Sequence, residues 1–199
     1  GIHGTLVGTI DNTVTAAGSR LMKNWLRQPL TDPEKINERL DRITEFIKDQ
    51  NMRQNIQAHL KEISDIERIL ARIANGKVSP RDVLNLGMSL AIIPLVKDTI
   101  NKKSNTLKQL LLRCDNTDKI TTSILNTLKI DPPTITKKGG YIHEGFSPEL
   151  DELRQLSEDA SKWMADMQLE EQNNTLIPNL KVGYNKVFGY YLEVTKTHV

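Results

Sequence analysis

The chain has 199 residues, 38% of them hydrophobic, and its 27 basic side chains nearly balance 25 acidic ones to give a net charge of +2. A charge so close to neutrality does not by itself indicate a nucleic-acid-binding protein. The single cysteine, Cys114, excludes an intramolecular disulfide framework and a cysteine metal site, and it is typical of a reducing cytosol.

No apolar run approaches the roughly 20 residues that a membrane helix needs. Residues 1–5 do not have the pattern of a signal peptide. We therefore expect a cytoplasmic chain with no membrane contact. Because Val199 falls where a strand could still continue, we also expect the chain to be an excised part of a longer protein.

Apolar spacing and capping side chains predict helices through the first half of the chain. Residues 4–12 are a short apolar segment. Residues 16–27 are predicted to form a helix that stops before Pro29. The next helix begins at Asp32, because an acid followed by proline and glutamate is favoured at a helix start. Its apolar stripe is Ile36, Leu40, Ile43 and Ile47.

Further helices are predicted at residues 53–61, 107–113 and 120–128. Between the first two of these, Ser64-Asp65-Ile66-Glu67 matches a capping box, and the helix that it opens should end at Asn75-Gly76. A second start signal, Ser79-Pro80-Arg81-Asp82, opens a helix that Pro94 should kink or end. Arg68, Arg72 and Arg81 are predicted to form structural ion pairs.

The pattern changes after residue 130. Residues 134–143 are predicted to form a small hairpin that turns at Gly139-Gly140. The last helix begins at Ser147-Pro148-Glu149 and continues for about 25 residues, or roughly 37 Å at 1.5 Å per residue. We place a domain boundary at residues 145–147. The apolar stripe of this helix is Leu150, Leu153, Leu156, Ala160, Trp163, Met164 and Met167.

The segment 180–196 is dense in aromatic and β-branched residues at nearly alternate positions, which predicts an antiparallel β-hairpin. Gly183 and Gly189 are expected to bracket its Tyr-Asn-Lys turn. The local charge also changes sign here. Residues 148–179 carry a charge of −6, whereas three lysines against Glu193 give +2 from residue 180 onward. Any contact with a polyanion should therefore be confined to the hairpin.

Three stretches resemble bacterial MutS mismatch-repair proteins, in family order along nearly the whole chain. Residues 180–194, LKVGYNKVFGYYLEV, resemble the start of the clamp region. Residues 11–30 resemble the lever region in the pattern Asp-x-Thr-x-Thr-x-x-Gly-x-Arg-Leu and the closing Trp-Leu-x-x-Pro-Leu, with Ala16-Ala17 replacing the common Pro-Met pair. Residues 65–82, from Asp-x-Glu-Arg to Ser-Pro-Arg-Asp, resemble the lever core.

The resemblance implies a mainly α fold. Residues 1–146 would form an elongated helical bundle, the lever, and residues 147–199 would supply a long helix and the first part of a clamp. In the family, the lever joins an ATPase to a clamp that closes over duplex DNA, and the whole protein is a homodimer that uses ATP and Mg. A MutL-type repair partner and a cytoplasmic, nucleoid-associated location are implied in the same way.

This sequence contains neither a phosphate loop nor the Phe-x-Glu motif with which the family reads mismatches. We therefore expect a non-catalytic segment with no catalytic residue, no metal site and no cofactor of its own. Its histidines, at positions 3, 59, 143 and 198, show no metal-ligand spacing.

The predicted DNA-backbone contacts are Lys181, Asn185, Lys186 and Lys196, with protection of a strand edge as the alternative role for the lysines. Sheet packing is favoured over base stacking for the tyrosines of the hairpin. The rival to DNA contact is a helical scaffold whose striped helix docks on a partner protein. Without the rest of the lever, the chain should self-associate through the hairpin or through Leu150, Leu153, Trp163 or Met167.

Overall fold

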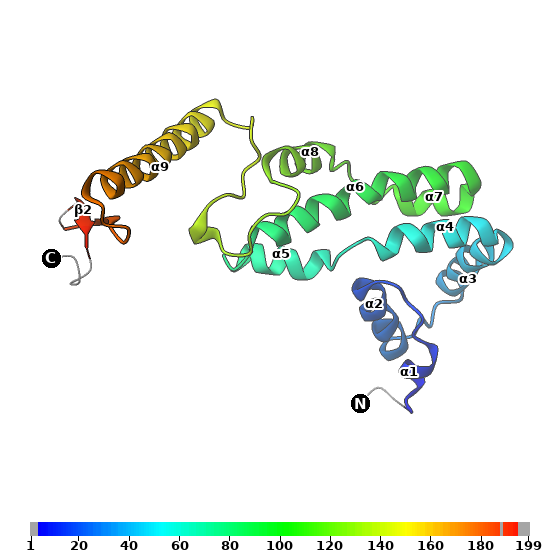
Figure 1. Ribbon diagram of the computed structural model, residues 1–199. Coiled ribbons are helices and arrows are strands. Elements are labelled where there is room, and N and C mark those ends of the chain that lie inside the picture. Colours follow the sequence, from blue (N-terminus) through cyan, green and yellow to red (C-terminus); the bar gives the residue numbers. More distant parts are fainter. Residues whose placement is uncertain (1–3, 188, 195–199) are drawn as a thin grey trace. The chain divides into compact units, whose positions relative to one another are not determined.

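A computed structural model describes residues 4–187 and 189–194 of the chain, with the side chain of residue 138 left out. The described chain is mainly helical and ends in a two-stranded antiparallel sheet (Figure 1), as predicted. It forms two compact units, Gly1–His143 and Glu144–Val199. The assignment of residues 1–146 to a lever, and of residues 147–199 to a long lever helix with the first part of a clamp, stays a prediction.

The first unit begins with two short helices that threonine side chains cap. Thr5 accepts a hydrogen bond from the Gly8 N–H at 3.1 Å, and Thr15 accepts one from the Gly18 N–H at 3.0 Å. The unit consists of α1 (Leu6–Ile10), α2 (Ala16–Arg27), α3 (Pro33–Lys48), α4 (Gln50–Lys61), α5 (Ile66–Ala74), α6 (Pro80–Lys103), α7 (Asn105–Leu111), α8 (Asp118–Thr127) and the 3-10 turn η1 (Thr136–Lys138).

The core of this unit lies where α4, α6 and α7 meet. Met52 and Ile56 of α4 pack with Ile100 of α6 and Leu107 of α7, and all four side chains are buried. Ser89 of α6 is also fully buried. Its hydroxyl is satisfied there, because it accepts a hydrogen bond from the Ser64 N–H at 2.9 Å and donates one to the Asn85 carbonyl. Helix α6 is therefore the centre around which the bundle is built.

The start of α5 is a correction to the expected capping box. The cap is Asp65, whose carboxylate accepts from the Arg68 N–H at 3.3 Å, and not Ser64. Ser64 is instead held by Ser89 of α6, a long-range contact that the local pattern could not indicate. The predicted end of the helix at Asn75-Gly76 is confirmed. Gly76 takes a left-handed φ of 63°, and the Lys77 N–H bonds the Arg72 carbonyl at 2.9 Å.

Helix α6 settles one alternative and corrects one expectation. It begins at the predicted signal, where Ser79 and Asp82 form a reciprocal capping box, and it continues through Pro94 to Lys103, so Pro94 does not end it. It is also long and apolar enough, by length and composition, to cross a membrane, so the expectation that no segment approaches that limit was wrong. The apolar content of α6 is used within the bundle, since Leu84, Leu86 and Ile100 are buried.

The hairpin expected at residues 134–143 does not form. Residues 136–138 make the 3-10 turn, and Ile142 pairs with Leu128 at the end of α8 in an isolated antiparallel bridge. The Lys129 N–H donates to the Tyr141 carbonyl at 3.0 Å, and the His143 N–H donates to the Thr127 carbonyl at 2.8 Å. The 3-10 turn takes the place of the first expected strand, and the second pairs with the end of α8 instead.

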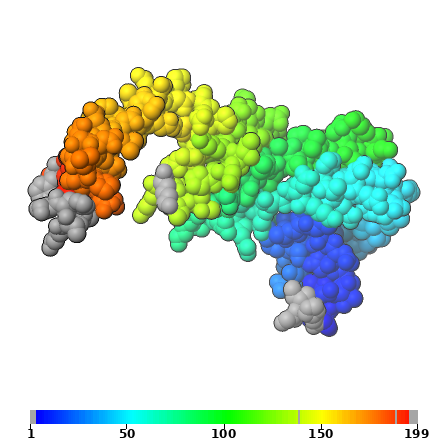
Figure 2. Space-filling view, in the orientation of Figure 1, coloured from blue at the N-terminus to red at the C-terminus, as the bar shows by residue number. Residues whose placement is uncertain are grey.

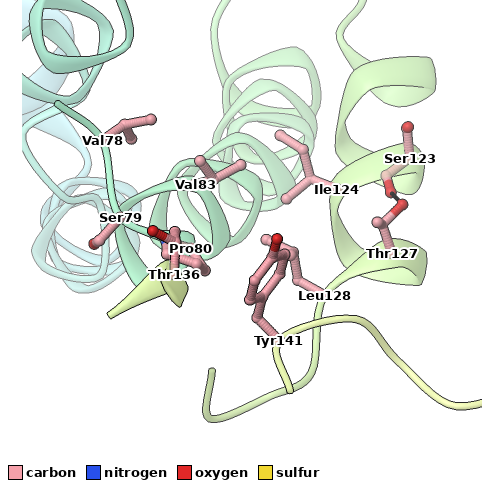
Figure 3. Close-up of a pocket in the computed structure, with 10 residues that line it drawn as sticks. All are labelled: Val78, Ser79, Pro80, Val83, Ser123, Ile124, Thr127, Leu128, Thr136 and Tyr141. Atoms are coloured by element: carbon pink, nitrogen blue, oxygen red, sulfur yellow. Dashed lines mark hydrogen bonds between the residues drawn. The ribbon is translucent and has the colours of Figure 1, made fainter. Parts of the chain in front are cut away.

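This pairing places Tyr141 against the start of α6 and the end of α8. Figure 3 shows its ring between Pro80 and Thr136 on one side and Leu128 and Ile124 on the other. These side chains line an open, mostly apolar pocket of about 370 Å³.

Side-chain packing and a cation–π contact attach α2 to the neighbouring helices. In Figure 2 the α1–α2 segment, in blue, lies against the cyan part of the bundle, and Met22 and Leu60 line the shallow pocket between them. Trp25 of α2 carries the Arg39 guanidinium of α3 over its ring at 3.6 Å from the centroid, a cation–π contact.

An ion-pair cluster also joins α2 to the start of α5. Arg20 donates two hydrogen bonds to the Asp65 carboxylate, at 2.7 and 2.8 Å, and a third to Glu67 at 2.8 Å. The same carboxylate caps α5, and its side chain is only 18% exposed. The hydrogen bonds from Arg20 lower the pKa of Asp65 to about 2 from its ordinary value of 3.8. Two stretches that resemble the lever region therefore meet in this cluster.

The Arg20 cluster was not predicted, whereas the predicted arginine ion pairs are present for two of the three residues. Arg72 pairs with Asp82 of α6 at 2.6 Å, and Arg81 pairs with Asp131 at 2.6 Å. Arg68 takes part through its backbone N–H, which donates to Asp65.

We predict that Arg20→Ala destabilises the first unit in a pH-dependent way. Because the folded pKa of Asp65 is depressed, its contribution to stability is present above pH ~4 and is lost as the pH falls towards ~2. The unfolding midpoint in urea should therefore be lower than wild type at pH 7, and the difference should shrink in acid. Fluorescence of Trp25 in a Trp163→Phe background would report it. Arg81→Ala, which breaks an exposed pair, is the matched control and should change little at either pH.

We predict that Gly87→Ala destabilises the chain although alanine normally favours a helix interior by about 0.5–1 kcal/mol over glycine. A Cβ at Gly87 would lie 2.6 Å from the Cγ2 of Ile124, where α6 and α8 cross. Overpacking of this kind costs about 1–3 kcal/mol, measurable by urea denaturation. In an Ile124→Ala background the same change should cost less, because only the contacts of 3.1 Å with the Cβ of residue 124 and 3.3 Å with the Cδ2 of Leu125 remain. An equal cost in both backgrounds would contradict this explanation.

Candidate nucleic-acid interface

The second unit begins with the long helix α9 (Pro148–Thr175), which starts and ends as predicted. The Ser147 hydroxyl accepts from the Leu150 N–H at 3.3 Å, and Pro148 occupies the first turn. Asp151 fixes the approach of the chain, since its carboxylate accepts from the Gly145 N–H at 2.7 Å and pairs with Arg154 at 2.9 Å. The negative charges of Glu149 and Asp151 in the first turn have the sign that the helix dipole favours at an N-terminus.

The chain reverses direction where α9 ends. Leu176 adopts a left-handed φ of 58°, and the Leu180 N–H closes the following turn on the Ile177 carbonyl at 3.2 Å. Leu180 is 3% exposed and is the buried anchor of the segment. The hairpin therefore begins beside the last turns of the helix from which it came.

The hairpin consists of β1 (Lys181–Asn185) and β2 (Gly189–Glu193) (Figure 1). Lys181 lies opposite Glu193 at the open end, and Asn185 lies opposite Gly189 next to the turn. The Asn185 side chain accepts from the Val187 N–H at 2.8 Å, and Gly189 has a φ of 76°. The turn is thus built by an asparagine at its start and a left-handed glycine at its end.

Gly183 does not bracket the turn, as the sequence had suggested, but lies within β1 opposite Tyr191. A Cβ at this position would lie 2.5 Å from the Cζ of the Tyr191 ring. The absence of a side chain here allows the ring to cross the strand.

The predicted DNA-contacting residues lie at different ends of the hairpin. Lys186 is exposed in the turn, whereas Lys181 is exposed at the open end, five residues or roughly 16 Å away at 3.3 Å per residue. Asn185 is partly buried and structures the turn. Lys196 lies outside the described residues. The two described lysines are therefore separate points of positive charge. Their separation equals about five base-pair steps of a DNA duplex.

The tyrosines pack within the sheet, as favoured from the sequence. Tyr184 and Tyr190 are cross-strand partners whose ring centroids are 4.9 Å apart, with an interplanar angle of 53°. Tilted aromatic pairs of this kind stabilise by about 0.5–1.5 kcal/mol beyond their buried area. Both remain more than 60% exposed, on the face of the hairpin that also carries Val182 and Leu192.

The apolar stripe of α9 is only partly covered. Trp163 and Met167 line an apolar hollow of about 270 Å³ together with side chains of both strands. Leu150 and Met167 are half-buried, but Leu153 is 59% and Trp163 66% exposed. Of the four predicted packing residues, Leu153 and Trp163 are therefore left mostly open to solvent by the described part of the chain.

Two residues that join α9 to the hairpin were missed from the sequence. The Val182 N–H donates to the Gln168 side-chain oxygen at 3.0 Å, and the Gln172 side-chain nitrogen donates to the Leu180 carbonyl at 2.8 Å. Their only sequence signal is a pair of amides four residues apart, which places both on one face of a helix.

Comparison with known proteins matches residues 1–187 to the family model "MutS domain III". The chain is 42% identical over 198 residues to the DNA mismatch repair protein MutS of Desulforamulus reducens, covering 99% of the chain and 23% of that protein. MutS of Symbiobacterium thermophilum is 38% identical over 200 residues, covering 100% of the chain and 23% of that protein. MutS of Bacillus cytotoxicus is 36% identical over 197 residues, covering 98% and 22%. The chain thus spans less than a quarter of the length of these relatives.

Proposed function

This chain belongs to the MutS family, and from that premise we propose that it serves in DNA mismatch repair as a non-catalytic lever with the first part of a clamp. The lever would transmit movement between an ATPase and the clamp, and the clamp would touch the backbone of duplex DNA without reading sequence. The relatives that the chain matches carry the name DNA mismatch repair protein.

The observation that carries this proposal is the contrast in charge between helix and hairpin. Lys186 is exposed in a turn whose backbone is held by Asn185 and Gly189, and it follows a helix with a large excess of acids. An acidic helix is repelled by polyphosphate, so contact is directed to the turn. A lysine is a point charge that suits phosphate contact, whereas sequence readout needs several side chains directed at base edges.

The activity of the whole protein extends the same proposal. By resemblance to the family we propose that it is a homodimeric, DNA-dependent ATPase that uses ATP and Mg, and that it acts in the cytoplasm with a MutL-type partner. None of these properties is assigned to residues of this chain. Its own contribution would be mechanical and electrostatic.

A salt titration of duplex binding tests the DNA contact. If Lys181, Lys186 and Lys196 each neutralise a phosphate, the logarithm of the binding constant should fall with the logarithm of salt at a slope of roughly −2.7. Changing all three to alanine should remove most of this slope and weaken binding to matched and mismatched duplexes alike. Lys162→Ala, on the acidic helix, is the control and should leave the slope unchanged. Equal slopes for wild type and the triple variant would remove the hairpin as the contact.

The rival function, a helical protein-binding scaffold, is favoured by one feature, the exposed apolar stripe of α9. Leu153 and Trp163 are each more than half exposed on this helix. Apolar surface of this kind is typically covered by a partner. In the scaffold reading the partner is another protein, and the hairpin lysines only protect a strand edge.

We predict that the isolated chain self-associates through this stripe at micromolar concentration. Leu153→Glu should shift the mass measured by sedimentation equilibrium towards the monomer. Gln155→Glu adds the same charge to the opposite side of the helix and should leave the mass unchanged. A wild-type chain that stays monomeric throughout this range would contradict the prediction.

A further inference from the structure

The contact between α9 and the outer edge of β1 has the form of a missing strand. In a β-strand, backbone groups of residues two apart point to the same edge. The Val182 N–H and the Leu180 carbonyl are such a pair, and they point away from β2. Gln168 accepts from the first at 3.0 Å, and Gln172 donates to the second at 2.8 Å. Two side-chain amides thus offer the edge one acceptor and one donor, as a neighbouring strand would.

The spacing of the two glutamines makes this arrangement rigid. Residues four apart lie one above the other on a helix face, so both amides reach the strand from consecutive turns of α9. Leu180 is buried beside them.

We propose that Gln168 and Gln172 are the positioning residues that couple the long helix to the DNA-contacting hairpin. Any displacement of the end of α9 moves two directional hydrogen bonds with it, and these set the direction in which the Lys186 turn is presented. The glutamines touch neither DNA nor a lysine; they act through the backbone of β1. This inference rests on the proposed function for its consequence in DNA binding, but the mechanical coupling itself can be measured without DNA.

The two hydrogen bonds run in opposite directions, which supplies a matched pair of variants. Gln168→Glu keeps an oxygen that can accept from the Val182 N–H. Gln172→Glu loses the donor and places a carboxylate against the Leu180 carbonyl. Both variants add one negative charge to the same face of the same helix at pH 7, four residues apart. They therefore differ mainly in whether the contact with the hairpin survives.

The first measurement is amide hydrogen exchange of residues 180–187 in the full 199-residue chain without DNA. Gln172→Glu should raise exchange in this segment at least tenfold over wild type, and Gln168→Glu should stay within about threefold. Circular dichroism should show the same helix content for both variants, so that loss of α9 is not the cause. Equal exchange in the two variants would overturn the coupling.

The second measurement is duplex binding at several salt concentrations. If the competent orientation of the hairpin falls to about a tenth of the population, the apparent affinity falls roughly tenfold. Gln172→Glu should show this loss relative to Gln168→Glu with the same salt slope, since both retain the same lysines. Equal affinities would overturn the positioning role. A wild-type chain whose binding does not depend on the hairpin lysines would defeat the proposed function instead, and the exchange result would still decide the coupling.

Discussion

A hairpin of two five-residue strands is marginally stable in water, and this constraint governs the second unit. Such a hairpin needs a surface to pack on and a partner for its outer edge. Helix α9 supplies both, through the apolar side chains around Trp163 and through the amides of Gln168 and Gln172. The geometry of the turn that carries Lys186 is therefore inherited from the helix. A long helix that holds a small cationic turn fits the lever and clamp that we propose.

The first unit solves a similar problem with charges. The α1–α2 segment is attached to the bundle by the Arg20 guanidinium, which holds the carboxylate that caps α5, and by the stacking of Arg39 on Trp25. One carboxylate thus serves as both a helix cap and an interhelical ion pair. Helix α6 contributes buried apolar side chains to the bundle, and its buried Ser89 accepts a hydrogen bond from Ser64 in the connection before α5. Polar contacts position the segments, and apolar contacts stabilise them.

Local signals in the sequence were sufficient for most helices and for the hairpin. Asp32, Ser79 and Ser147 cap the helices that they were predicted to open, because a cap involves only residues within one turn. The misses involve distant partners. The Ser64 N–H donates to Ser89 of α6, and the strand expected near Ile142 pairs with the end of α8. The Arg20 cluster and the two glutamines join residues that no local pattern connects.

We propose that the hairpin alone touches duplex DNA and does so without base readout. Hydrogen exchange of the chain with saturating matched and mismatched duplexes tests this proposal. We expect protection of residues 181–194, equal for the two duplexes, and no change along residues 148–167. Protection along the helix, or protection that depends on the mismatch, would contradict it.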